Sequence, residues 1–129
     1  MPAPSDRQYT QSHEWIKIDA PGSATVGLSD FAVKAIKDIV FLELPAKGAK
    51  LQALKPFGVI ESVKAVFDLF APASGVVADA NTAMQEDFET LSKDPYGKGW
   101  LLKLSLSTDP LPPLMDSVAY DKFCAESHH

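Results

Sequence analysis

The side chain best suited to chemistry in this chain is the amine of Lys64, which lies in the run Phe57-Gly58-Val59-Ile60-Glu61-Ser62-Val63-Lys64-Ala65-Val66-Phe67-Asp68. Apolar and polar residues alternate on both sides of a pause at small residues. This pattern predicts two strands joined by a turn. A lysine at a hairpin tip exposes its ammonium to solvent, where an enzyme can modify it, although an ordinary soluble turn looks the same. The geometry alone leaves both interpretations open.

Side chains for catalysis are scarce. His13 is the sole histidine before the final pair, and the chain lacks a Gly-rich phosphate loop and the metal-ligand spacings HxxxH and CxxC. Ser12, His13 and Glu14 are consecutive, and consecutive residues of a strand face opposite sides, so they are not expected to form a triad. We therefore expect no catalytic residue, no metal site and no enzymatic activity.

Composition narrows the class of protein. The 129 residues suit a single domain over 1–129, and we expect a monomer. A formal net charge of −5 argues against a nucleic-acid surface, which needs clustered positive charge. No run approaches the roughly 20 apolar residues of a membrane span, and the start lacks the apolar stretch of a signal peptide. These features favour a cytoplasmic protein, or a mitochondrial-matrix one in a eukaryote.

The lone cysteine, Cys124, excludes an internal disulfide. It is either a small packed residue or a reactive thiol. The origin of the terminal pair, His128 and His129, is left open.

Short strands broken by Gly and Pro turns dominate the rest of the chain. Alternating residues predict strands over 14–19, 23–28, 39–44, 76–78 and 100–106. We therefore expect a mainly β fold with short helices (α+β), arranged as a flattened barrel or sandwich.

Three helices are predicted between these strands. Ser29 is expected to cap one that ends near Asp38, and Asn81 one that runs to Glu86. The last lies within about 114–126, with Met115, Ala119 and Phe123 on one face. The first helix has a single apolar stripe, composed of Leu28, Phe31, Ala32, Ala35 and Ile36.

The segment around Lys64 closely resembles the lipoyl-attachment segment of the glycine cleavage system H-protein family. The matching residues are Glu61-Ser62-Val63-Lys64-Ala65, then Asp68, then Ala71-Pro72-Ala73-Ser74-Gly75. Biotin carriers place a methionine on each side of the lysine, whereas Val63 and Ala65 flank it here. Three further blocks resemble the family in order and spacing: Tyr9-Thr10-Gln11-Ser12-His13-Glu14-Trp15, Asp38-Ile39-Val40-Phe41-Leu42-Glu43-Leu44-Pro45 and Asp94-Pro95-Tyr96-Gly97-Lys98-Gly99-Trp100-Leu101.

The resemblance implies the barrel-sandwich hybrid fold of lipoyl and biotinyl carriers, with its core over about 8–110 and lipoate attached covalently to Lys64. It implies a non-catalytic carrier that shuttles an aminomethyl intermediate. The implied partners are a lipoate ligase or lipoyltransferase, a pyridoxal-phosphate glycine decarboxylase, a tetrahydrofolate-dependent aminomethyltransferase and dihydrolipoyl dehydrogenase.

The resemblance also implies roles for residues around the lysine. By motif position, Ser12, Glu14 and Asp68 line a cleft for the loaded arm, where carboxylates and a hydroxyl suit a cationic amine. Glu61 is expected to be an acidic landmark for the lipoylating enzyme. The plainer alternative is that Glu14, Asp68 and Glu61 are solvated strand residues.

Departures from the family pattern gather near the arm. Phe67 stands where a small serine is usual, Lys37 replaces a glycine, and Leu54-Lys55-Pro56 replaces an acidic loop. They allow a second hypothesis, an H-like lipoate-binding protein that carries sulfur intermediates in cytoplasmic sulfur oxidation with a heterodisulfide-reductase-like complex. Phe67 beside the arm suits that cargo, but the retained Ser12, Glu14 and Asp68 favour glycine cleavage. A third hypothesis, a scaffold that has lost its cofactor, conflicts with the retained lysine segment.

Overall fold

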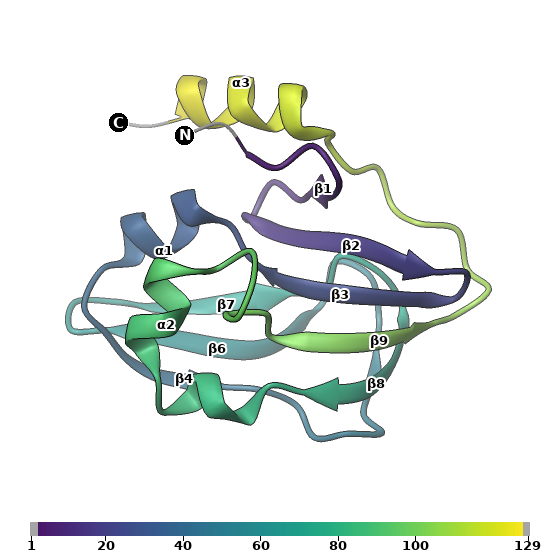
Figure 1. The fold of residues 1–129 in the computed structure, drawn as a ribbon, viewed down its shortest axis with the longest axis horizontal. Helices are drawn as coiled ribbons and strands as arrows, with labels where there is room; N and C mark the ends of the chain where they lie inside the picture. The colour runs from purple at the N-terminus through teal and green to yellow at the C-terminus, as the bar shows by residue number, and fades with distance from the viewer. Residues whose placement is uncertain (1–2, 128–129) are drawn as a thin grey trace.

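The chain forms two antiparallel sheets that face each other across a shared core (Figure 1). The structure is a computed structural model and describes residues 3–127, so His128 and His129 lie outside the described residues. The larger sheet has the order β1 (Gln8–Tyr9), β2 (Glu14–Ala20), β3 (Ser23–Leu28), β9 (Leu102–Leu106), β8 (Gly75–Ala80) and β5 (Lys50–Leu51). The smaller sheet has the order β4 (Ile39–Glu43), β6 (Pro56–Ser62) and β7 (Val66–Phe70).

Short helices complete the fold, so the expected mainly β class is confirmed. They are α1 (Asp30–Ile36), the 3-10 turn η1 (Thr82–Gln85), α2 (Phe88–Lys93) and α3 (Ser117–Ser127). In Figure 1, α1 and α2 lie at the end of the sheets where the turn between β6 and β7 projects, and α3 lies above β1 and β2.

The core draws on both sheets because each strand turns alternate side chains inward. Val26 and Leu104 come from the larger sheet, and Leu42, Ile60 and Leu69 come from the smaller one; all are buried in a single cluster. Burying each such side chain stabilises the fold by about 1.5–3 kcal/mol. The smaller sheet is therefore fixed along its length, and its hairpin extends from a rigid base.

Helix α1 begins as predicted. The Ser29 hydroxyl accepts a 3.1 Å hydrogen bond from the Ala32 amide, which satisfies a donor of the first turn. The helix ends at Ile36, and the next two residues, Lys37 and Asp38, have positive φ angles of 52° and 42°. This corner leads the chain into β4, which pairs with β6.

Helix α3 packs through Tyr120. Its ring stacks on Tyr9 with centroids 4.3 Å apart, and its hydroxyl shares a 2.6 Å hydrogen bond with Ser29. The predicted face was wrong at Ala119, which is exposed. The helix turns Tyr120, Phe123 and Cys124 inward instead, so Cys124 packs in this second cluster as a half-buried free cysteine.

The prediction at η1 was only partly right. Asn81 takes the N-cap position, as expected, but its side chain makes no capping hydrogen bond. Its amide donates to the carbonyls of Lys98 and Trp100 at 3.1 and 2.7 Å. The helix after it is a 3-10 turn that ends at Gln85. Three short elements were not predicted, namely β1, β5 and α2, and the strand expected from Trp100 begins at Leu102.

Candidate functional site

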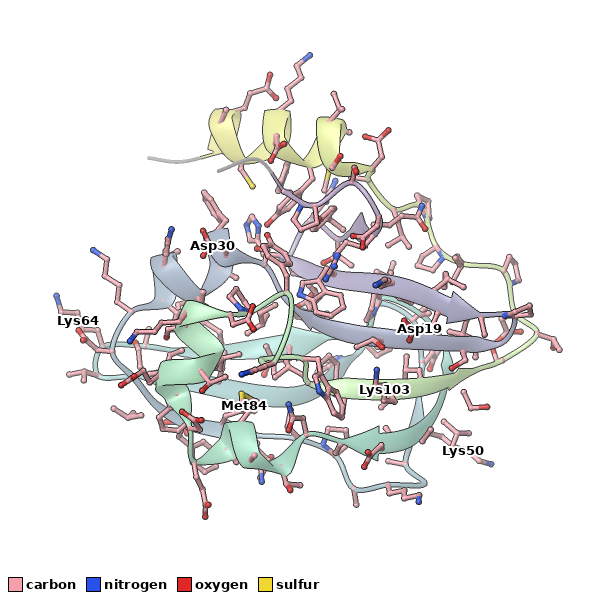
Figure 2. The ribbon with its side chains drawn as sticks, in the orientation of Figure 1. Asp19, Asp30, Lys50, Lys64, Met84 and Lys103 are labelled. Carbon is pink, nitrogen blue, oxygen red and sulfur yellow. The ribbon has the colours of Figure 1, made fainter. Side chains whose placement is uncertain are left out.

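Lys64 lies at the tip of the β6–β7 hairpin, as predicted. Ser62 builds the turn: its amide donates to the Ala65 carbonyl at 2.8 Å, and its hydroxyl accepts from the amides of Lys64 and Ala65 at 3.2 and 3.1 Å. The Lys64 side chain is exposed, and within residues 3–127 no hydrogen bond or ion pair engages its amine. Figure 2 shows Lys64 at one end of the molecule, opposite Lys50.

A cleft of about 450 Å³ runs beside strand β7, which starts just after Lys64. One wall is β7 itself, from Val66 to Phe70, and the floor includes Ile60 of β6. The opposite wall is the apolar stripe predicted for the first helix, with all five members present: Leu28, Phe31, Ala32, Ala35 and Ile36. The sequence thus identified this wall, but as a helix face and not as part of a cleft.

The remaining lining residues are polar, and hydrogen bonds place Ser12 and Glu14 next to Phe70, at the end of β7. The polar residues are Ser12, His13 and Glu14 from the segment before and at the start of β2, together with Asp68 from β7. Ser12 and Asp68 are exposed. Ser12, Glu14, Asp68 and Phe67 therefore all line this one cleft.

Glu14 is fully buried behind the cleft, so the interpretation of Glu14 as a solvated strand residue is wrong. Its Oε1 accepts hydrogen bonds from the hydroxyls of Thr10 at 2.6 Å and Ser12 at 2.5 Å, and its Oε2 accepts one from the Phe70 amide at 3.0 Å. Burial raises the pKa of the Glu14 carboxyl above its usual range, and these hydrogen bonds partly oppose that rise. Glu14 mainly joins the β1–β2 segment to the end of β7.

Ser12, His13 and Glu14 do not lie on one strand, contrary to the sequence argument. Strand β2 begins at Glu14, and His13 has a φ of 74° in the preceding turn, so Ser12 and Glu14 hydrogen-bond directly. A triad is nevertheless not formed, because His13 Nδ1 shares a 2.7 Å hydrogen bond with Tyr120. The His13 ring also stacks on Phe31, with centroids 4.6 Å apart, and its burial lowers its pKa.

Glu61 does not reach the cleft. It is half-buried on β6, where its cross-strand neighbours are Phe41 of β4 and Val66 of β7. Cross-strand pairing places these three side chains on the same face of the smaller sheet. The structure thus separates Glu61, beside the hairpin, from the polar residues that line the cleft.

Sequence reasoning missed two contributors to the site. Ser62 shapes the tip through its hydroxyl, and a serine two residues before a predicted turn lysine is the signal from which this role could have been predicted. His13 lines the cleft, but its position depends on Tyr120, 107 residues away, and no local pattern reveals such a contact.

Comparison with known proteins decides the family. The family model described as "Glycine cleavage H-protein" matches residues 7–127. The chain belongs to the glycine cleavage H-protein family. The glycine cleavage system H protein of Rubrobacter xylanophilus is 50% identical over 107 residues, covering 83% of this chain and 84% of that protein. That of Symbiobacterium thermophilum is 45% identical over 124 residues, covering 95% and 96%.

A solved structure agrees with this assignment. The crystal structure of a glycine cleavage system H protein from Mycobacterium marinum superimposes with a TM-score of 0.86 at 40% identity, covering 92% of this chain and 96% of that chain. The expected barrel-sandwich carrier fold is therefore confirmed.

Membership of the H-protein family establishes the class of function. H-proteins are the lipoyl carriers of the glycine cleavage system, they are not catalytic, and they carry lipoate covalently on a lysine. The family implies interaction with the enzymes of that system and with a lipoyl ligase. The relatives give no support to the sulfur-oxidation hypothesis.

Within residues 3–127 no group of metal-ligating side chains is present, and no helix there is long and apolar enough to cross a membrane.

Proposed function

We propose that Lys64 is the lysine of this H-protein that carries lipoate, and that the cleft beside β7 receives the loaded arm. The observation that supports the attachment point is an exposed, unpaired lysine at the tip of a hairpin whose base is buried in the core. A rigid base presents the amine in a constant geometry to several enzymes in turn. Lipoate attached there supplies a disulfide that opens to two thiols, one of which can hold a transferred group.

The dimensions of the cleft fit such an arm. A lipoyl-lysine arm reaches roughly 10–15 Å from the backbone, and four residues of extended chain span at most about 14 Å. The arm therefore reaches from Lys64 as far as Asp68, on the β7 wall of the cleft. The predominantly apolar walls suit the arm's methylene chain, because contact with them removes apolar surface from water.

The polar residues then have distinct roles. Asp68 and Ser12 are exposed and can hydrogen-bond directly to a cationic amine. Glu14 acts from behind the cleft, where it holds Ser12 and the Phe70 backbone in place. Phe67 contributes an aromatic wall that shields the arm from water. Glu61 stays outside the cleft, where the lipoylating enzyme can recognise it as an acidic landmark near Lys64.

The partners follow from this assignment. The lipoate ligase or lipoyltransferase modifies Lys64, and the arm then visits the glycine decarboxylase, the aminomethyltransferase and dihydrolipoyl dehydrogenase. Residues 1–129 act as one carrier domain, as a monomer, in the cytoplasm.

Intact mass spectrometry tests the attachment point. Expression with lipoate and a lipoate ligase is expected to add one lipoyl group, and the addition is expected to disappear in Lys64→Arg but to persist in Lys50→Arg. An unchanged mass of the wild-type protein under conditions that lipoylate a known H-protein would refute the assignment. A lipoylated Lys64→Arg protein would place the arm on another lysine.

A further inference from the structure

The corner between α1 and β4 holds a second lysine at the root of the proposed arm. Lys37 has φ 52° and ψ 159°, a region of backbone space that glycine adopts readily and other residues avoid. A side chain at this position strains the fold. Strain of this kind tends to occur at functional sites, where the surrounding structure enforces it.

Hydrogen bonds on both sides of the corner hold Lys37 in this backbone conformation. The Lys37 amide donates to the Val33 carbonyl at 3.2 Å, and the carbonyl of the next residue, Asp38, accepts from the Val63 amide at 3.2 Å. The corner is therefore bonded on one side to α1 and on the other to the residue that precedes Lys64. A rigid backbone connection holds Lys37 in a constant position relative to the hairpin tip.

The Lys37 side chain is exposed. Lys34, one turn earlier, forms a 2.8 Å ion pair with Asp30, whereas no ion pair or hydrogen bond engages the Lys37 amine within residues 3–127. Lys37 and Lys64 line the same hollow of about 260 Å³. The exposed Asp38 lines this hollow as well. Amide formation removes the charge of Lys64, so Lys37 is then the one ammonium among the residues that line the hollow, beside the Asp38 carboxylate.

We propose that Lys37 is a docking residue that pairs with a carboxylate at the mouth of the active site of an enzyme that takes in the Lys64 arm. This inference rests on the proposed attachment at Lys64. An enzyme that admits the arm must bring the rim of its channel against the hairpin tip, and Lys37 meets that rim. The rest of the chain is acidic, with a net charge of −5, so a fixed ammonium at this point orients the carrier on an acidic rim.

Steady-state kinetics of the lipoylated carrier with the decarboxylase, the aminomethyltransferase and dihydrolipoyl dehydrogenase test the proposal. Intact mass first establishes lipoylation of every variant at Lys64, so a failure of the attachment assignment is seen separately. Lys37→Gln removes the charge and keeps a long side chain, Lys37→Gly removes both, and Lys50→Gln is the matched control, an exposed lysine at the opposite end of the molecule (Figure 2).

Both Lys37 variants are expected to raise the KM of the carrier for at least one enzyme by about two- to fivefold at low salt, with kcat unchanged. The increase should disappear at high salt, because exposed ion pairs are screened. Lys50→Gln should change neither constant. Unchanged KM values with all three enzymes, or an increase that persists at high salt, would overturn the proposal.

Discussion

The Phe70 amide donates a 3.0 Å hydrogen bond to Oε2 of Glu14, which lies 56 residues earlier in the chain. Phe70 ends β7, the strand that follows Lys64, and Glu14 begins β2 of the other sheet. The bond therefore joins the two sheets at the cleft, which both residues line. Because the other carboxylate oxygen accepts from Thr10 and Ser12, a single buried side chain holds the segment before β2 against the end of β7.

The buried carboxyl makes stability depend on pH. Since the pKa of Glu14 is raised above its ordinary value of 4.5, the folded state holds this proton more tightly than the unfolded state. Its contribution to stability is thus fully present below pH 4.5 and is lost as the pH rises through the folded pKa. As the pH rises from 4.5 through the folded pKa, the free energy of unfolding of the wild-type protein should fall relative to that of Glu14→Gln. The expected fall is about 1.4 kcal/mol for each unit by which the folded pKa exceeds the unfolded one.

Urea unfolding of both proteins between pH 4 and pH 8 measures this difference, with Glu43→Gln, an exposed carboxylate of β4, as the control. A difference between wild type and Glu14→Gln that stays constant over the whole range would contradict the burial of an ionisable group at this position.

The sequence predicted those parts of the site that local patterns encode. Alternation on both sides of Lys64 identified the hairpin, and Ser29 identified the start of α1. The burial of Glu14 was not predictable in this way, because it depends on a hydroxyl four residues before it and on an amide 56 residues after it. Helix α2 was missed because only six residues form it, so its apolar residues, Phe88 and Leu91, are too few to mark a helix on their own.

A glycine at position 37 should stabilise the fold. Relief of the backbone strain at Lys37 contributes about 1–3 kcal/mol, and the greater freedom of glycine in the unfolded chain offsets part of it. We expect a net gain of about 1 kcal/mol in the free energy of unfolding of Lys37→Gly. Lys34→Gly, inside α1, should instead lose about 1 kcal/mol. Denaturant titrations measure both, and a destabilised Lys37→Gly protein would show that the corner is not strained.

Protonation of His13 should weaken the packing of α3. The His13 ring lies against Phe31 and Phe123 and hydrogen-bonds to Tyr120, and burial lowers its pKa below 6.5. A lowered folded pKa contributes stability that is present above pH 6.5 and is lost as the pH falls through the folded pKa.

The free energy of unfolding, compared between wild type and His13→Gln from pH 7.5 to pH 5, should show the wild-type protein losing its advantage on acidification. His128 and His129 remain in both proteins, so their titration does not affect the comparison. NMR titration of the His13 ring gives its pKa directly, and a value at or above 6.5 would contradict the expectation.

Asp68 should protect the cargo of the loaded arm. Asp68 is the exposed carboxylate among the lining residues of the cleft, and it lies within reach of an arm on Lys64. The Asp68→Asn variant keeps the shape of the side chain but loses the charge-assisted hydrogen bond to a cationic amine. The carrier, loaded by the decarboxylase and then separated from it, should release ammonia into water about two- to fivefold faster in the variant, the range expected for an exposed charge pair. Glu43→Gln is again the matched control, since Glu43 is exposed but lies outside the cleft lining. Equal rates for wild type, Asp68→Asn and Glu43→Gln would show that the loaded arm does not rest beside Asp68 in this cleft.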